Sequence, residues 1–301
     1  MSGDLSILMY HRVLAQTDPL LPGAPDQAMF ARQMRLVRRW FRVLPLPLAL
    51  DLLAQQRLPA RSLAITFDDG YADNAELALP VLRSLDLAAT FFIASASLDG
   101  GRMWNDDVIA CVRQAPHGVL DGGIAGLGPL PVRTPAQRYQ ALQLLLAALK
   151  YRPHAERQAL AAQLAPPEAA ALMMTSDQVR LLHRQGMTIG GHTHSHPILA
   201  CLAERDAERE IAYNKLLLER LTGAPVELFA YPNGKYGPDF DDRHAALVRA
   251  LGFRAALTTN PGVTRAGTDR FRLPRYTPWQ PDRPRFLAAL LRNRYRDVPA
   301  A

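Results

Sequence analysis

The sequence predicts an α/β fold in which a parallel sheet curls into a barrel. Short apolar runs alternate with amphipathic helical stretches along most of the chain, which is the order expected of parallel strands joined by helices. Polar groups directly follow several of the apolar runs, and barrels of this kind place their sites at the carboxyl ends of the strands. The 301 residues suit one such domain.

The first half of the chain contains four expected strands and three expected helices. Pro25 and Asp26 begin a helical pattern in which Phe30, Met34 and Val37 recur at helical spacing. The expected strands are residues 5–10, 42–46, 62–68 and 89–93, and the expected helices are residues 25–41, 48–56 and 74–85.

The alternation of expected strands and helices stops after residue 94 and returns near residue 175. This stretch holds a Gly/Pro-rich loop and helical segments rich in Ala, Leu and Gln. Because the apolar stripes of these segments are narrow, we expect the stretch to lack a core of its own. We predict one domain over residues 1–301, with a helical insertion at residues 94–175 that either covers one rim of a site or serves only for packing.

The last part of the chain brings the count to about seven strand–helix units. Thr175 or Ser176 caps the first of its helices, and Gly223 ends the second. The expected strands are residues 187–189, 226–230, 253–258 and 271–275, and the expected helices are residues 176–184, 204–221, 243–251 and 284–294.

Composition limits the partners that the chain can have. The formal charge is +7, but the arginines are scattered and no aromatic platform for bases lies between them. This favours a solvated basic surface over nucleic-acid binding and leaves contact with an anionic membrane face or an acidic glycan open. The two cysteines predict no disulfide framework, and we expect both to be buried. Because neither a signal peptide nor a bilayer-length apolar run is seen, we expect a cytoplasmic protein.

Two motifs carry the chemistry. Asp68 and Asp69 stand side by side at the end of an apolar run, where two like charges require a compensating cation. His192, His194 and His196 follow a second apolar run. Each motif alone has an ordinary explanation, since Asp-Gly pairs favour turns and exposed histidines are common. Together, imidazole and carboxylate ligands predict a site for zinc or a neighbouring first-row metal with one position open for water.

These motifs resemble those of the polysaccharide deacetylase family, also called the NodB-homology domain or carbohydrate esterase family 4. The family's Thr-Phe-Asp-Asp-Gly is present verbatim from Thr66 to Gly70, and its His-Ser/Thr-x-x-His-Pro is matched by His192, His196 and the residues between and after them. The resemblance covers nearly the whole chain and implies a distorted barrel of the (β/α)7 type. It also implies that Asp69, His192 and His196 hold a divalent metal, Zn²⁺ or else Co²⁺ or Ni²⁺. Asp68 would then be the general base.

The resemblance is strongest to one branch of the family, the poly-N-acetylglucosamine deacetylases. That branch has a similar N-terminal Tyr-His, whose histidine is the general acid, and His11 takes this place here. The family's third motif corresponds to residues 230–234, which implies contact of Tyr231 and Asn233 with the substrate and an oxyanion bound by the Asn233 backbone N–H. The arginine of that motif is missing. Arg272 or Arg275 could replace it, and we place Arg275 at the site.

The function implied is that of a metal-dependent hydrolase that removes N-acetyl groups from an amino sugar in a polysaccharide or a lipid-linked glycan precursor. An O-acetyl esterase or a small-molecule amidohydrolase on the same fold is the alternative within the enzymes. A glycan-binding protein that has lost catalysis is the alternative outside them, and the missing arginine favours it slightly. His194 would be a second layer behind the ligands or a wall of the groove.

Overall fold

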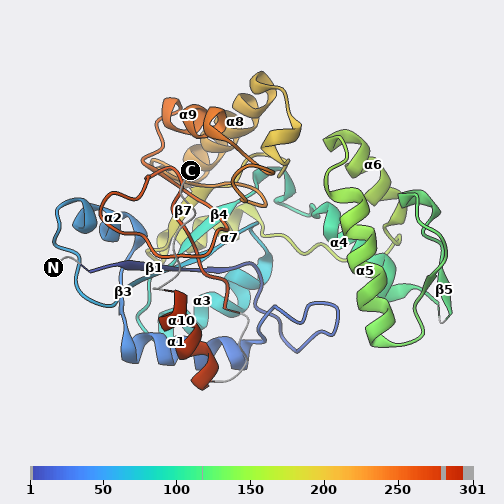
Figure 1. Cartoon of the computed structure of the whole chain (residues 1–301), viewed down its shortest axis with the longest axis horizontal. Helices are drawn as coiled ribbons and strands as arrows, with labels where there is room; N and C mark the ends of the chain where they lie inside the picture. The colour runs from blue at the N-terminus through green and yellow to red at the C-terminus, as the bar shows by residue number, and fades with distance from the viewer. Residues whose placement is uncertain (1–2, 117, 279–282, 294–301) are drawn as a thin grey trace.

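The computed structural model describes residues 3–116, 118–278 and 283–293, and it shows one parallel sheet wrapped by helices (Figure 1). The sheet has seven strands in the order β1-β3-β4-β7-β8-β9, with β2 pairing beside β3. The strands are β1 Leu5–Tyr10, β2 Arg42–Val43, β3 Ser62–Phe67, β4 Thr90–Ile93, β7 Thr188–Gly191, β8 Leu228–Ala230 and β9 Ala255–Leu257. The predicted distorted barrel is confirmed.

The two edges of the sheet are joined by the segment that was expected to form a last strand. It forms isolated bridges instead, from Leu273 to Leu257 of β9 and from Tyr276 to Leu8 of β1. The Met9 N–H also donates to the Tyr276 carbonyl at 2.9 Å. This segment therefore lies between the first and last strands and brings its own side chains into the barrel.

Helices follow the strands as expected, with a few shifted boundaries. Asp26 caps α1, Thr175 and Gln178 form a capping box on α7, and Gly223 ends α8 in the left-handed conformation. The helices around the barrel are α1 Gln27–Trp40, α2 Leu46–Ala54, α3 Leu79–Ser84, α7 Ser176–Arg184, α8 Glu204–Thr222, α9 Asp242–Ala250 and α10 Arg283–Asn293. Short 3-10 turns lie at Ser95–Ser97, Gly123–Ala125 and Leu199–Cys201.

Prolines explain two of the shifts. The expected strand at residues 42–46 stops at Val43, because Pro45 already stands at the N-cap position of α2 and Pro47 in its first turn. The expected helix at residues 74–85 begins as a π-helix, Asn74–Ala78, in which the Leu79 N–H donates to the Asn74 carbonyl. Pro80 then stands at the second position of α3; because α3 continues directly from the π-helix, its missing N–H leaves a carbonyl of the preceding turn without a helical partner.

The barrel interior is a small apolar cluster of alternate strand residues and α2 side chains. Its buried members include Ile7, Ala64, Phe92, Ala230, Leu257, Leu273 and, from α2, Leu46, Ala49 and Leu50. Because α2 packs on these residues, it closes the end of the barrel opposite the green helices in Figure 1. A larger cluster lies between the outer face of the sheet and the surrounding helices.

Gly190→Ala is expected to destabilise the barrel by about 1–3 kcal/mol, because overpacking forces neighbouring side chains from their positions. A Cβ on Gly190 would come within 2.4 Å of the Phe92 ring, which fills the interior. Urea unfolding measures the effect. Gly128→Ala is the matched control, since nothing lies within 4 Å of its added Cβ. Equal stability of the two variants would contradict the prediction.

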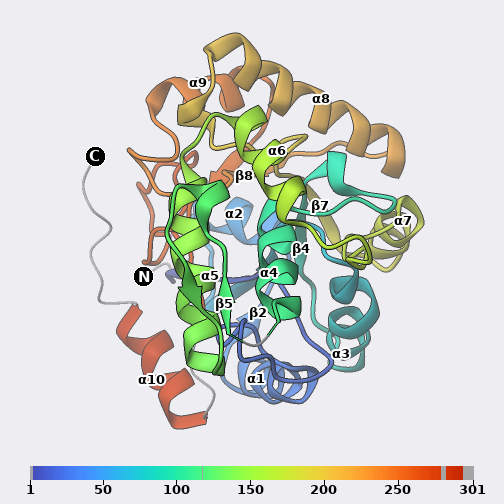
Figure 2. The same ribbon diagram turned by 90° about the vertical axis from the view of Figure 1, so that its right-hand side faces the viewer.

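The helical insertion stands beside the carboxyl end of β1 and faces the viewer in Figure 2. It contains α4 Trp104–Gln114, a hairpin of β5 Val119–Leu120 and β6 Leu130–Pro131, α5 Pro135–Lys150 and α6 His154–Leu164. The expectation that it lacks a core is wrong. Its helices and hairpin surround their own buried cluster, which also takes in Leu20 from the loop after β1; the cluster includes Val108, Val112, Leu130, Val132, Leu142, Leu145, Leu149 and Ala161. The division into one domain with an insertion at residues 94–175 stays a prediction.

The structure also bears on two smaller expectations, the burial of the cysteines and the absence of a helix that could span a membrane. Cys201 is exposed and Cys111 is half-buried, so the expectation of two buried thiols is wrong. No helix in the described part of the chain has both the length and the apolar character that crossing a bilayer requires.

Candidate active site

The carboxyl ends of four strands bring the candidate residues to one place. His11 follows β1, Asp69 follows β3, His192 and His196 follow β7, and Asn233 follows β8. All of them line one cavity of about 410 Å³. Because parallel strands end at the same edge of a sheet, this grouping follows directly from the topology.

Asp69, His192 and His196 form a compact cluster. One ligand atom from each lies within 4.8 Å of the others. The Asp69 Oδ1 atom is 3.3 Å from the Nε2 atoms of both histidines. One carboxylate oxygen and two imidazole nitrogens are a donor set that suits zinc and its first-row neighbours, so these residues fit a divalent metal.

Several residues at and beside this cluster have left-handed backbone conformations, and these orient the side chains. Asp69, Thr193, His196 and Asn233 all have positive φ, at 76°, 63°, 56° and 59°. Such conformations are uncommon for residues other than glycine, and they gather at functional sites where the surrounding structure holds them. Each strand therefore ends in a sharp turn that directs its ligand or its N–H toward the shared cavity.

His192 is held in one orientation. Its Nδ1 atom lies 2.7 Å from the Ala230 carbonyl oxygen, and its backbone N–H donates to Asn214 Oδ1 at 3.0 Å. The bond to a carbonyl requires the proton on Nδ1, which leaves Nε2 facing Asp69 as the free ligand atom. Burial lowers the pKa of His192, but the hydrogen bond to Asp69 and the charge of Asp68 outweigh it and raise the pKa above its ordinary value.

His196 and Asp69 titrate in opposite directions. Burial lowers the pKa of the His196 imidazole to about 3, so the ring is neutral at pH 7, as a metal ligand must be. For Asp69, burial raises the pKa, yet the bond to His192 and the neighbouring rings outweigh it and keep the pKa well below its usual range. The cluster thus offers a carboxylate and a neutral imidazole at neutral pH.

Asp68 forms a buried ion pair with Arg275. The guanidinium donates two hydrogen bonds of 2.6 Å to the two carboxylate oxygens, and its Nε donates to the Thr258 carbonyl at 2.8 Å. Both residues are only 1% exposed. Burial raises the pKa of Asp68, but the charge of Arg275 outweighs it and holds the pKa below its ordinary value. Asp68 is therefore an ionised carboxylate with fixed geometry beside the metal-ligand cluster.

Of the two arginines considered in place of the missing one, Arg275 contacts Asp68. Arg272 pairs instead with Asp242 and Asp269. Because the Arg275 side chain is buried, its expected place at the site is corrected in one respect: it contacts the Asp68 carboxylate and does not line the site cavity.

Tyr231 also needs a correction. It is fully buried, stacks on Phe240 with ring centroids 3.7 Å apart, and donates from its hydroxyl to the Phe271 carbonyl at 3.1 Å. The ring therefore packs behind the site and does not reach a substrate. Asn233 does line the cavity. None of the described residues accepts a hydrogen bond from its backbone N–H.

His194 points away from the cluster. Its Nδ1 atom lies 3.0 Å from Ser95 Oγ, and its ring packs edge-on against Tyr213 at 4.7 Å between centroids. Asn214, which holds the His192 backbone, also donates to Ser95 Oγ at 2.9 Å. His194 is thus linked to the cluster through two intermediate residues and does not form a wall of the site cavity.

The helical insertion contributes residues that no sequence pattern singled out. Trp104, Asn105, Gln143 and Lys150 line the same cavity as the metal-ligand cluster. Arg157 of α6 donates to the His196 carbonyl at 3.4 Å and lies 5.0 Å from the Trp104 ring centroid. These side chains belong to amphipathic helices, and their register against the barrel depends on packing between segments far apart in the sequence.

A further contact joins the insertion to the loop that carries the two histidine ligands. The Nε2 atom of His154, at the start of α6, lies 3.0 Å from Ser195 Oγ, which donates to Glu210 Oε1 at 2.7 Å. The insertion therefore supports the loop between His192 and His196 from outside the cavity.

Fold and site together define an α/β barrel with an Asp-His-His metal-ligand cluster and a buried, arginine-paired aspartate at the carboxyl ends of its strands. The chain belongs to the polysaccharide deacetylase family, whose profile matches residues 55–120 and 147–256, more than half of the sequence. The family resemblance seen in the motifs is confirmed.

Individual relatives are distant. The candidate polysaccharide deacetylase YxkH of Bacillus subtilis (strain 168) is 21% identical over 260 residues, which are 86% of this chain and 66% of that protein, just under two thirds of its length. The IcaB structure from Ammonifex degensii superposes with a TM-score of 0.64 at 20% identity and 97% coverage of both chains. The Streptococcus pyogenes deacetylase PplD, solved with acetate, gives a TM-score of 0.61 at 19% identity, covering 91% of this chain and 92% of that one. At these identities the superpositions establish the fold.

Proposed function

We propose that the chain is a metal-dependent hydrolase that removes N-acetyl groups from an amino sugar within a polysaccharide or a lipid-linked glycan precursor. The observation that carries this proposal is the ion pair of Asp68 with Arg275 next to the cluster of Asp69, His192 and His196. A base kept ionised beside a metal-ligand cluster is what hydrolysis of an unactivated amide requires.

Asp69, His192 and His196 would hold the metal, which we expect to be zinc, with cobalt or nickel as alternatives. Such an ion would lower the pKa of a bound water to about 7 and would polarise the acetyl carbonyl. Asp68 accepts the proton of the attacking water, because Arg275 keeps this carboxylate ionised and oriented.

The remaining roles go to residues on the other sides of the cavity. The Asn233 backbone N–H, turned by a φ of 59°, donates to the oxygen on which negative charge develops. His11, at the exposed rim, delivers a proton to the leaving nitrogen. A glycan-binding protein without catalysis needs neither a base nor an acid, and Arg275 in the place of the missing motif arginine counts against that alternative.

Acetate release after metal removal tests this function. The protein is stripped with a chelator and assayed on N-acetylglucosamine oligomers, lipid-linked acetamido sugars and acetylated xylan, with zinc, cobalt or nickel restored singly. We expect acetate from the N-acetylated substrates only when metal is present, and a loss of about 10²–10⁴-fold in His11→Ala.

The controls separate the alternatives. Release from acetylated xylan alone would favour an O-acetyl esterase. Sugar binding without turnover, at full metal content, would favour the binding protein and would overturn the proposal. The cytoplasmic location and a peripheral contact with an anionic membrane surface stay predictions from the sequence.

A further inference from the structure

Two helices that are far apart in the sequence form a basic surface on the flank of the barrel. Helices α1 and α10 contact each other, and both lie at the lower edge of the molecule in Figures 1 and 2. Neither helix contains an aspartate or a glutamate. The basic face, as we call this surface, consists of the exposed side chains of Arg32, Arg35, Arg38, Arg39, Arg285 and Arg292. Arginines that are scattered along the sequence therefore gather on one surface.

The two sides of α1 have opposite character. Phe30 and Val37 are buried against the sheet. Because an α-helix turns once every 3.6 residues, Arg32, Arg35 and Arg39 share the opposite side, which faces outward. None of the α1 arginines forms an ion pair with a residue that the structure describes. Their charges are thus not neutralised by the described part of the chain.

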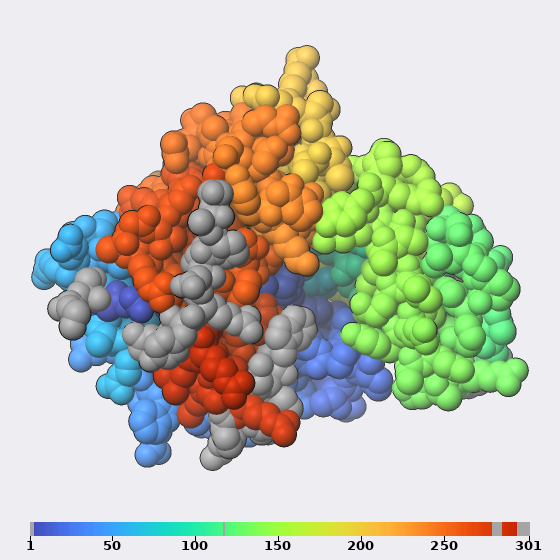
Figure 3. Space-filling view, viewed as in Figure 1, coloured from blue at the N-terminus to red at the C-terminus, as the bar shows by residue number. Residues whose placement is uncertain are grey.

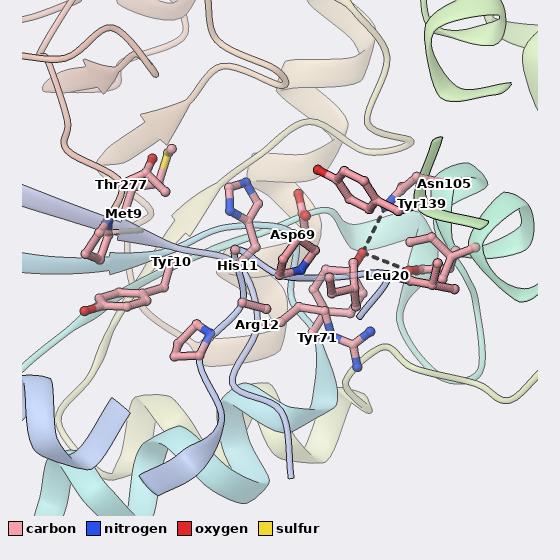
Figure 4. A pocket seen from close by; sticks show the side chains of 18 of the residues that line it. Met9, Tyr10, His11, Arg12, Leu20, Asp69, Tyr71, Asn105, Tyr139 and Thr277 are labelled. Carbon is pink, nitrogen blue, oxygen red and sulfur yellow. Dashed lines mark hydrogen bonds between the residues drawn. The ribbon is translucent and has the colours of Figure 1, made fainter. Parts of the chain in front are cut away.

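Arginines elsewhere in the molecule have carboxylate partners. Arg12, which lies near the site in Figure 4, pairs with Asp73 at 2.8 Å. On the exposed side of α8, Arg209 lies 3.6 Å from Asp206. A helix with charges of both signs, such as α8, is the ordinary solvated surface. The single sign of charge on α1 and α10 instead favours an anionic partner.

Exposed apolar side chains accompany these charges. Trp40, the last residue of α1, is 46% exposed, and Leu291 of α10 is 54% exposed. The guanidinium carbon of Arg39 lies 5.8 Å from the Trp40 ring centroid. Basic side chains beside tryptophan and leucine are typical of surfaces that enter the headgroup layer of a bilayer. Binding of single-stranded nucleic acid would call for a row of stacking rings, and the described residues of the two helices expose only the Trp40 ring.

The basic face is separate from the site. Figure 3 shows α10 low on the molecule, away from the green insertion at the right. None of the six arginines lines the site cavity. A partner bound to the basic face would therefore leave the cavity accessible to a substrate.

We propose that the basic face binds the surface of an anionic bilayer, which makes the chain a peripheral membrane protein that docks through α1 and α10. The arginines pair with lipid phosphates, and Trp40 and Leu291 enter the headgroup layer. Composition left both an anionic membrane and an acidic glycan open, and the exposed apolar side chains favour the membrane. This inference does not depend on the proposed reaction.

Sedimentation with vesicles tests the proposal. The vesicles contain about one part phosphatidylglycerol to three parts phosphatidylcholine, and pure phosphatidylcholine is the neutral comparison. We expect binding to the anionic vesicles at about 0.1 M salt and its loss at about 1 M, where the screening length falls from about 10 Å to about 3 Å. The triple variant Arg32→Gln/Arg35→Gln/Arg39→Gln should bind about a hundredfold more weakly, since each arginine near an anionic surface contributes about fivefold.

The matched control is the triple variant Arg205→Gln/Arg209→Gln/Arg220→Gln, which removes the same charge from exposed arginines of α8. It should bind the anionic vesicles as the natural protein does. Equal losses in the two variants would overturn the proposal, because net charge and not the basic face would then decide. Binding to duplex DNA or to alginate, with none to the vesicles, would also overturn it and identify a different partner.

Trp40 provides a second readout that leaves the charges unchanged. Its fluorescence should shift to the blue on anionic vesicles and be quenched by brominated lipid, because the ring moves from water into the headgroup layer. Trp40→Phe should lose both signals. A protein that sediments with the vesicles but shows neither change would contradict docking through this end of α1.

Discussion

Arg275→Met is expected to lower the free energy of unfolding by about 3–5 kcal/mol at pH 7, because removing one partner of a buried ion pair leaves an uncompensated charge. The partner left behind is Asp68, which is 1% exposed and receives both guanidinium hydrogen bonds. Methionine keeps much of the side-chain volume, so the loss reports the charge and not a cavity. Urea unfolding followed by tryptophan fluorescence measures it.

The pH dependence of this loss distinguishes electrostatics from packing. In the natural protein the pKa of Asp68 is held below its unfolded value, so its stabilising contribution is present above about pH 4 and is lost as the pH falls through the folded pKa. Without Arg275, only the charges of His192 and His11 still oppose burial, so the pKa of Asp68 rises, and acidification protonates the carboxyl and reduces the destabilisation of the variant. We expect the difference between the two proteins to shrink from pH 7 to pH 4.5.

Arg272→Met serves as the control, since Arg272 lies in the same segment but pairs with Asp242 and Asp269 at the surface. Surface pairs contribute about 0–1 kcal/mol. A loss in Arg275→Met that is as small as this, or that stays constant with pH, would contradict the interpretation of Asp68 as a buried carboxylate that depends on its arginine.

Asp68→Asn is expected to reduce kcat for acetate release by about 10²–10⁴-fold while the protein retains its metal. Asn cannot accept a proton from water, but its carbonyl oxygen still accepts one hydrogen bond from Arg275. Asp68 is not part of the cluster whose ligand atoms lie within 4.8 Å of one another. Metal content by elemental analysis and acetate release, measured on the same sample, give the two readouts.

Asp69→Asn is the comparison variant, because it separates loss of the metal from loss of the base. Asp69 Oδ1 lies 3.3 Å from both histidine Nε2 atoms, so its replacement should remove metal and activity together. If Asp68→Asn also lost its metal, or if it kept full turnover, the division of the two neighbouring carboxylates into base and ligand would be wrong.

The ligand cluster and the barrel were predictable because their signals are local. Strand ends show as apolar runs that stop at polar residues, and Asp69, His192 and His196 stand in short motifs. Arg275 was only one of two choices, because it lies 207 residues from Asp68 in the sequence. It reaches Asp68 through the bridges that Leu273 and Tyr276 make to the two edges of the sheet, which no local pattern encodes.

The core of the insertion and the direction of the His194 side chain could not be predicted, for different reasons. The insertion's core is shared among three helices, a hairpin and Leu20, so each helix shows only a narrow stripe. His194 stands two residues after His192, and an extended chain would point both the same way. Thr193 instead has a φ of 63°, which a β-branched residue rarely adopts, and the chain turns His194 outward.

The contacts of α6 with the histidine loop make the insertion and the metal-ligand cluster one thermodynamic system. Arg157 donates to the His196 carbonyl, and His154 contacts Ser195, so detaching α6 from the barrel also releases the backbone that presents a ligand. Linkage is reciprocal: whatever fixes the histidine loop raises the free energy of local opening of α6, and whatever fixes α6 tightens the loop by the same amount. A substitution that loosens α6 from the barrel would therefore also weaken the hold of the strand ends on a metal, although it touches no ligand.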